Sequence, residues 1–279
     1  EILPTVRNDA HKLIEECMLC ANVATARFMQ ELDIPALYRV HDGPKPEKVE
    51  RLRQFLGSMG LSLTRKKGDP SPEDYAAVLA RVQDRPDAQL IQTVMLRSLS
   101  QAVYTPHNAG HFGLNYEAYT HFTSPIRRYP DLLVHRAIRY AISGVKAPGY
   151  AYSPTQMGTM SVHCSNNERR AQEAERDVDE RYKCAWMEKH VGSTFAGVVS
   201  GVTSFGLFVE LSESRINGLV HITQLPNDYY HFDPKRHLLT GERRGLKFRL
   251  GDPVHVQVLR ASLEDRKIDL RLAADPAGR

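Results

Sequence analysis

Apolar residues recur at three- and four-residue intervals along the first two thirds of the chain, a spacing typical of amphipathic helices. The first helix is expected from Asn8 to about Gln30, with Asn8 or Asp9 at its N-cap. Glu15 and Asn22 are seven positions apart, so at about 100° per residue they nearly eclipse each other beside the apolar stripe. They are expected to face either a wet cleft or open solvent at the helix edge. The stripe consists of Leu13, Ile14, Cys17, Ala21, Ala24 and Phe28.

The same period predicts a helical array that fills the chain up to its last third. Ser71 and Asp74 have the spacing of a capping box, and Gly60 is placed to end a helix. Further helices are expected over residues 46–59, 72–83, 87 to about 104, about 129–142 and 154–186.

Near Gly192 the pattern changes from helical to alternating, which indicates short strands. Gly, Ser, Asn and Asp residues separate these strands. Five strands within about 80 residues favour a small closed barrel. We therefore expect an α+β fold with a domain boundary at residues 190–193. The five strands are expected around residues 195–199, 205–211, 218–222, 254–259 and 268–272.

Composition and charge narrow the class of protein without identifying it. A chain of 279 residues with 42 % hydrophobic and 25 % charged residues is expected to fold as two globular domains. The net charge of +4 is too small an excess to indicate a nucleic-acid partner by itself. The apolar runs are too short for a transmembrane helix, and the first residues lack the features of a signal peptide. A cytoplasmic location without a membrane partner is the expectation.

The four cysteines are too few for a disulfide framework in a chain of this length. Cys17 and Cys20 form a C-x-x-C pair inside the first helical pattern, whereas Cys164 and Cys184 are too far apart to complete a zinc site. We expect reduced residues in or near the core, with a zinc or redox protein as an alternative.

Three blocks in the barrel region carry the first functional signal: GVTSFGLFV at 201–209, GLVHI at 218–222 and LGDPV at 250–254. In this order they resemble the OB-fold RNA-binding module named after ribosomal protein S-one. The resemblance implies that Phe205, Phe208 and His221 lie on an RNA face and that Lys267 supplies a cation. Exposed rings stack on bases without reading sequence. Leu263 stands where that family commonly has an acidic residue.

Two further segments add candidate RNA contacts. A loop at 228–232, followed by Lys235 and Arg236, combines aromatic and basic residues. In the helical part, Arg127, Arg128 and Tyr129 precede a helix, where backbone N–H groups and guanidinium groups together suit a phosphate. Taken alone, such an arginine pair is more often a solvated surface feature.

The surrounding segments change that interpretation. HFGL at 111–114, the long run HFTSPIRRYPDLLVHR at 121–136 and DAHKLIEECM at 9–18 resemble the ribonuclease II, or RNB, family, and within it the ribonuclease R group. The resemblance implies that residues 1–191 are the mainly helical C-terminal portion of an RNB catalytic domain, followed by the barrel at 192–274. It also implies a processive, Mg²⁺-dependent 3′-to-5′ exoribonuclease that hydrolyses single-stranded and structured RNA to nucleoside 5′-monophosphates. Single-stranded RNA, ribosomes and the trans-translation machinery are the implied partners.

The same resemblance assigns roles to residues of this chain. Arg127 falls on the catalytic arginine that neutralises charge on the scissile phosphate, beside Arg128 and Tyr129. Glu15 or Glu16 falls on the glutamate that contacts the terminal ribose, and the eclipsing of Glu15 with Asn22 favours Glu15. The resemblance also implies an acidic catalytic residue near the site of product release. Glu175 falls on this position, with Glu173 as the alternative.

The family's metal-binding aspartate cluster has no counterpart in this sequence. Asp9 stands alone, and Asp177 and Asp179 lie beside Arg176 and Arg181 on a helix. The expectation is therefore a C-terminal piece without a metal site of its own, inactive in isolation, whose Mg²⁺ is bound mainly by a missing N-terminal half. A non-catalytic RNA-binding adaptor, in which Arg127 only anchors phosphate, is the alternative from another class.

Overall fold

The first helix, α1 (Asp9–Leu32), begins where the sequence predicts, at Asn8. The Asn8 side chain accepts a hydrogen bond from His11 N (3.0 Å), and the His11 side chain accepts one from Asn8 N (3.3 Å). The Asn8 cap thereby stabilises the free N–H groups of the first turn.

The computed structural model describes residues 7–63, 68–85, 87–144, 149–234 and 238–273.

The apolar stripe of α1 is not the face that the structure buries. Leu13 and Ile14, in the N-terminal half of α1, are 64 % and 59 % exposed. The buried face belongs to the C-terminal half, where Ala26 packs with Tyr38 and Met29 packs with Val134. Cys17 and Cys20 are likewise exposed, so their expected place near the core was wrong, while Cys164 and Cys184 are buried.

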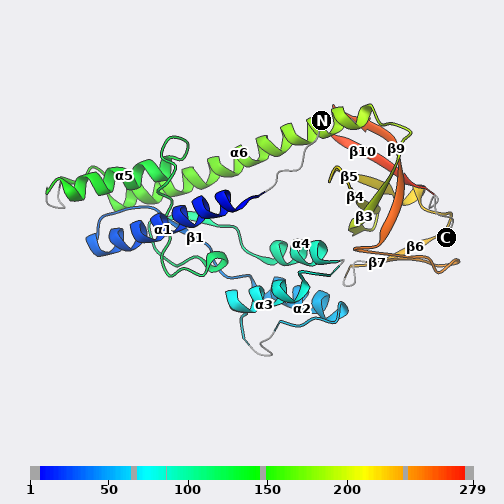
Figure 1. Ribbon diagram of the computed structural model, residues 1–279, viewed down its shortest axis with the longest axis horizontal. Coiled ribbons are helices and arrows are strands. Elements are labelled where there is room, and N and C mark those ends of the chain that lie inside the picture. The colour runs from blue at the N-terminus through cyan, green and yellow to red at the C-terminus, as the bar shows by residue number, and fades with distance from the viewer. Residues whose placement is uncertain (1–6, 64–67, 86, 145–148, 235–237, 274–279) are drawn as a thin grey trace.

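Three helices pack around a core of their own, below α1 in Figure 1. They are α2 (Pro46–Ser58), α3 (Pro72–Val82) and α4 (Ala88–Ser98), and the Ser71–Asp74 capping box opens α3. The helix expected to reach residue 104 ends at Ser98 instead. Strand β2 (Val103–Thr105) follows and pairs antiparallel with β1 (Tyr38–Val40), and Tyr104 N in this strand donates to Ser165 Oγ of the later chain.

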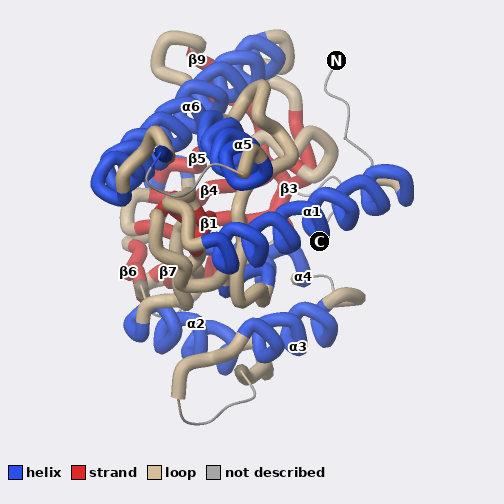
Figure 2. The backbone as a smooth tube through the Cα atoms, turned by 90° about the vertical axis from the view of Figure 1, so that its left-hand side faces the viewer, coloured by secondary structure: helices blue, strands red, loops and turns tan. Residues whose placement is uncertain are grey.

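Helices α5 (Tyr129–Ile142) and α6 (Pro154–Glu188) lie on the opposite side of the molecule from α2 and α3 (Figure 2). The 35 residues of α6 span about 52 Å at 1.5 Å per residue. Its first turns bury Met157 against Leu133, and its last turns bury Cys184 and Met187 in the barrel. Its middle turns are exposed, so α6 connects the helical part to the barrel.

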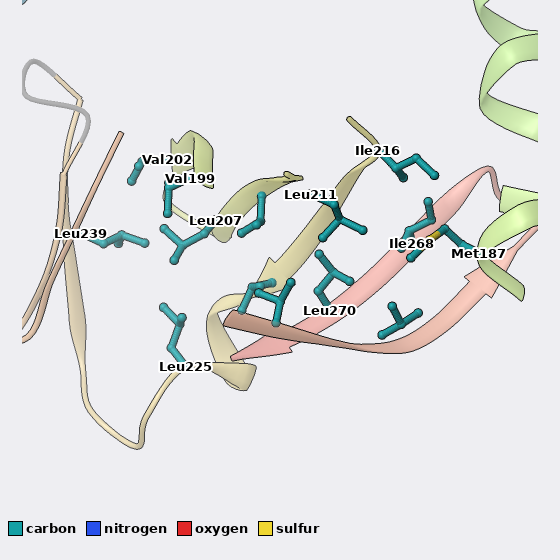
Figure 3. Packing of buried hydrophobic residues seen from close by; sticks show 14 of the residues in the cluster. Met187, Val199, Val202, Leu207, Leu211, Ile216, Leu225, Leu239, Ile268 and Leu270 are labelled. Atoms are coloured by element: carbon teal, nitrogen blue, oxygen red, sulfur yellow. The ribbon is translucent and has the colours of Figure 1, made fainter. Parts of the chain in front are cut away.

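The barrel is closed in the order β10-β5-β4-β3-β9, and all five strands correspond to predicted ones. A hydrophobic core fills it, with Met187 of α6 beside Ile268 (Figure 3). Gly192 (φ +89°) turns the chain between α6 and β3. The strands are β3 (Thr194–Thr203), β4 (Gly206–Leu211), β5 (Asn217–His221), β9 (Pro253–Ser262) and β10 (Lys267–Leu272).

Between β5 and β9 the chain forms a separate antiparallel sheet that sequence reasoning treated as a loop. Its strands are β6 (Tyr230–Asp233), β7 (Leu238–Gly241) and β8 (Lys247–Arg249). Its four-residue and three-residue strands are too short for a clear alternation in the sequence. Lys235 and Arg236, expected in the same cluster, lie outside the described residues.

Side chains of Leu250 and Arg266 add contacts between the barrel and the helical part. Leu250 packs against the barrel core and against the core of α2, α3 and α4 at the same time. Arg266, in the turn between β9 and β10, forms an ion pair with Asp177 in the middle of α6. None of the described helices has the combination of length and apolar character that crossing a bilayer requires.

Candidate functional site

The turn before α5 is built around one buried carboxylate, that of Asp131. Its Oδ1 accepts hydrogen bonds from Ser124 N (2.8 Å) and from Arg128 Nη2 (2.8 Å), and the residue is completely buried. Asp131 also lies in the first turn of α5, where the helix dipole favours a negative charge. Ser124 O in turn accepts the N–H groups of Arg127 (3.3 Å) and Arg128 (3.0 Å). This set of bonds fixes the backbone of the turn.

The two arginines of this turn consequently face different ways. Arg128 points inward to Asp131, whereas Arg127 is exposed to solvent. Tyr129 is also at the surface, and its hydroxyl accepts a hydrogen bond from Arg136 Nη1 (3.3 Å). Of the three predicted residues Arg127, Arg128 and Tyr129, Arg127 is thus the one whose exposed guanidinium can bind a phosphate.

A cavity of about 670 Å³ brings three of the predicted residues together. Glu15 and Asn22 of α1 and Arg128 line it, and Tyr119 forms another part of the wall. Asn22 is buried, donates to Tyr119 Oη (2.9 Å) and accepts from Phe122 N (3.0 Å). Glu15 is exposed and accepts a hydrogen bond from Arg7 (2.6 Å). The eclipsed pair therefore faces a cleft, while Glu16 is exposed outside this lining.

Behind the cavity lies a layer of tyrosines and histidines that sequence reasoning did not assign. Tyr104 Oη and His121 Nδ1 are hydrogen-bonded at 2.8 Å, and the Arg39 guanidinium lies 4.6 Å from the centroid of the Tyr104 ring. Arg39 in turn pairs with Glu168 of α6 at 2.7 Å. The one available signal was the density of aromatic and histidine residues in the segment 104–122.

The histidines of this layer are uncharged at neutral pH. Burial, with a contribution from Arg128, lowers the pKa of His121 to about 3. Burial, with a contribution from His41, lowers the pKa of His111 to about 4. Burial also raises the pKa of Tyr104, so this hydroxyl stays protonated and can donate to neutral His121. His111 and His121 therefore add no positive charge behind the cavity, whereas Arg128 places one at its wall.

On the barrel, both predicted rings reach the surface. Phe205 and Phe208 are 47 % and 37 % exposed, with ring centroids 6.0 Å apart and planes at 88°. Gly206 between them has φ +152°, and a Cβ there would lie 2.3 Å from Val220 O, so the turn requires glycine. Gly206 pairs with His221, which places that exposed imidazole next to the rings.

Lys267 does not join this group. The parallel pairing of β10 with β5 sets Leu270 beside Val220, so Arg271 and not Lys267 is level with His221. Lys267 is four residues back, about 13 Å along the strand at 3.3 Å per residue. Arg271, which sequence reasoning missed, donates to Gln257 Oε1 (2.7 Å).

A second cavity, of about 910 Å³, lies between the barrel and helices α2 and α4. Phe208 lines it from the barrel, and Lys48, Arg51 and Arg97 line it from the helices. The cations and the exposed ring thus face the same space, which suits an anionic chain that carries flat bases.

The acidic residues of α6 lie apart from the first cavity. Glu173 and Glu175 are exposed on the middle turns of α6 and do not belong to the cavity lining. In the described residues, no three His, Cys, Asp or Glu side chains are grouped so that they could hold a metal ion. The residues present do not fit a Mg²⁺ centre, nor do exposed Cys17 and Cys20 find further zinc ligands there.

Comparisons with known proteins agree with this geometry. The RNB domain family matches residues 1–144, and the S1 RNA binding domain family matches residues 188–272. Ribonuclease R of Vibrio cholerae is 52 % identical over 280 residues, covering 97 % of this chain and 34 % of the relative. Ribonuclease R of Escherichia coli is 50 % identical, covering 96 % and 34 %. The chain thus spans about a third of the length of these curated relatives.

Solved structures show the same architecture. The apo form of Mycoplasma genitalium RNase R superimposes with a TM-score of 0.89 at 26 % identity, covering 96 % of this chain and 42 % of that one. Yeast Ssd1, described as a pseudonuclease, shares the fold with a TM-score of 0.69 at 23 % identity, covering 84 % of this chain and 29 % of that one.

Replacing Asp131 by asparagine is expected to lower the free energy of unfolding by about 3–5 kcal/mol, because Arg128 then remains largely buried beside a neutral amide. Chemical denaturation measures this loss. Asp265→Asn is the matched control, since the Arg260–Asp265 pair is solvent-exposed (3.0 Å) and such a pair is worth about 0–1 kcal/mol. Equal losses in the two variants would contradict the central role of Asp131.

The lowered histidine pKa values predict acid sensitivity. A histidine that is neutral in the folded state contributes stability that is complete above the unfolded pKa of 6.5 and is lost as the pH falls toward 3. The slope is at most about 1.4 kcal/mol per pH unit for each histidine. Denaturation between pH 7 and pH 4 measures it. His121→Asn should flatten the profile, whereas His107→Asn, at an exposed site, should leave it unchanged; parallel profiles for all three proteins would contradict the assignment.

Proposed function

Because the chain belongs to the RNB family and carries an S1 RNA binding domain, we propose that it is the C-terminal part of an exoribonuclease of the ribonuclease R kind. The whole enzyme would degrade RNA processively in the 3′-to-5′ direction to nucleoside 5′-monophosphates. The curated relatives from Vibrio cholerae and Escherichia coli, both named ribonuclease R, support this activity class.

The observation that carries the proposal is the pair of arginines on the fixed turn before α5. Asp131 anchors Arg128 at the wall of the cavity that Glu15 and Asn22 also line, and the guanidinium of Arg127, the preceding residue, stands in solvent. A fixed guanidinium can neutralise the charge that develops on a phosphate during hydrolysis. Glu15, whose carboxylate oxygens accept hydrogen bonds, would bind the hydroxyls of the terminal ribose.

The barrel would hold the RNA upstream of this cavity. Phe205 and Phe208 would stack on bases, with His221 beside them, while the cations of the second cavity bind phosphates. One structural relative, Mycoplasma genitalium RNase R, has been solved in complex with ribose-methylated single-stranded RNA, at 26 % identity to this chain. Single-stranded RNA is accordingly the proposed ligand.

The metal requirement would be met elsewhere in the longer protein. The described residues offer no grouped ligands for Mg²⁺, and the chain spans only about a third of its curated relatives. We therefore expect RNA binding without turnover from this chain alone. Glu175 would act near product release, at the exposed middle of α6.

Replacing both barrel rings, as Phe205→Ala/Phe208→Ala, is expected to raise the Kd for single-stranded RNA at least about tenfold, because each stacked base contributes about 1–3 kcal/mol. Fluorescence anisotropy with labelled oligoribonucleotides of different sequence measures it, and the loss should not depend on sequence. Phe28→Ala removes a partly exposed ring from α1 and should have no effect. An unchanged Kd in the double variant would place the RNA site away from these rings.

The catalytic role is tested in the full-length protein. Arg127→Ala should lower kcat by about 10²–10³, since it removes one group that stabilises the transition state, while RNA affinity changes little. Release of mononucleotides from labelled RNA in Mg²⁺ measures kcat, and Arg139→Ala on the far end of α5 is the matched control. Unchanged turnover would exclude Arg127 from catalysis. Robust release by the isolated chain would contradict its proposed dependence on the rest of the protein, and no release by either form would favour an RNA-binding adaptor.

A further inference from the structure

The sheet formed by β6, β7 and β8 has one buried face and one open face. Paired residues in antiparallel strands lie on the same face, and successive residues alternate. Leu239 pairs with Phe232 and with Phe248, and all three pack against the barrel core. The opposite face therefore points away from the barrel.

That open face carries a row of polar and basic residues across the three strands. Thr240 pairs with His231 on one side and with Lys247 on the other, and Arg249 is two positions along β8, on the same face. His231, Lys247 and Arg249 are exposed. At about 3.4 Å per residue, the two β8 cations are about 7 Å apart along the strand.

Two more cations are held at the end of this sheet. Arg243 and Arg244 occupy the turn between β7 and β8, and their backbone N–H groups donate to the two oxygens of Asp228 (2.9 and 2.8 Å). Asp228 also accepts from Tyr229 N (2.8 Å), and these backbone N–H groups lower its pKa, so the carboxylate keeps the turn in place at neutral pH.

The acidic residues around the sheet are already engaged. Asp228 bonds to the backbone of the turn, Glu242 lies 3.5 Å from His231, and Asp233 has a partner of its own. Within the described ranges, none of the four cations Arg243, Arg244, Lys247 and Arg249 forms an ion pair. Exposed cations that form no ion pair suit a polyanion.

Aromatic side chains identify which polyanion fits. Tyr229 is 66 % exposed, and its ring lies edge-on to the His231 ring at 5.0 Å between centroids. Flat exposed rings beside cations match bases beside phosphates, whereas an acidic protein segment offers nothing that stacks on a ring. The sheet also lies next to the strand pair that carries Phe208, since β7 and β8 contact β3, which pairs with β4.

We propose that the open face of β6–β8, with Tyr229 and the β7–β8 turn, is a second RNA-binding surface that holds the phosphodiester backbone of a single strand. It rests on the proposed function and extends the RNA footprint beyond Phe205 and Phe208. Its contacts do not read sequence, because cations bind phosphates and rings stack on any base.

The test compares the Kd of this chain for labelled single-stranded RNA of 20 and of 5 nucleotides between 50 and 500 mM KCl. For the 20-mer, Lys247→Ala/Arg249→Ala should reduce the slope of log Kd against log KCl concentration by about 1.4, because each lost phosphate contact removes about 0.7 from this slope. At 0.1 M KCl, the Kd should rise about 25-fold. For the 5-mer, which the barrel rings alone can hold, the same variant should bind like the parent. Arg243→Ala/Arg244→Ala should show the same pattern.

Controls separate this inference from the function on which it rests. Arg139→Ala/Lys189→Ala removes the same charge from two helices and should leave both Kd values unchanged; circular dichroism checks that every variant folds. If the sheet variants bind the 20-mer like the parent while Phe205→Ala/Phe208→Ala fails, the second surface is overturned and the proposed function stands. If the parent binds neither RNA, the proposed function fails. Equal loss of affinity for poly-glutamate would also overturn the inference, because it would indicate a general site for acidic chains.

Discussion

The geometry of the candidate site depends on a single buried charge, the carboxylate of Asp131. A buried carboxylate is stable only when it is paired with a cation or accepts hydrogen bonds. Asp131 pairs with the Arg128 guanidinium and also accepts a hydrogen bond from the backbone N–H of Ser124. Because one arginine of the pair is used for this purpose, the other is left at the surface. Of these two adjacent arginines, Arg128 therefore has a structural role, and Arg127 is the candidate catalytic residue.

Much of the architecture could be predicted from the sequence, because it depends on local patterns. The Asn8 and Ser71 caps, the start of α5 and all five barrel strands follow from residue spacing alone. The eclipsing of Glu15 and Asn22 also follows, and both residues line one cavity. Helical geometry alone fixes that relation, whatever the rest of the fold does.

The features that the sequence could not predict depend on contacts between distant segments. The apolar stripe of α1 is indistinguishable in the sequence from a core-facing stripe, yet Leu13 and Ile14 are exposed. The layer of Tyr104, His121 and Arg39 assembles from residues up to 82 positions apart. Likewise, the register of β10 against β5 decides that Arg271, and not Lys267, is level with His221. Pairing registers of this kind have no local signature.

Helix α6 has a consequence for how the molecule can be observed. Trp186, the single tryptophan of the chain, lies where α6 enters the barrel and stacks on His190, with ring centroids 4.0 Å apart at 27°. The junction between the two parts therefore contains its own fluorophore, remote in sequence from Arg127. Tryptophan emission and quenching report on how the C-terminal end of α6 packs against the barrel. The contact between the helical part and the barrel can therefore be followed without an attached label.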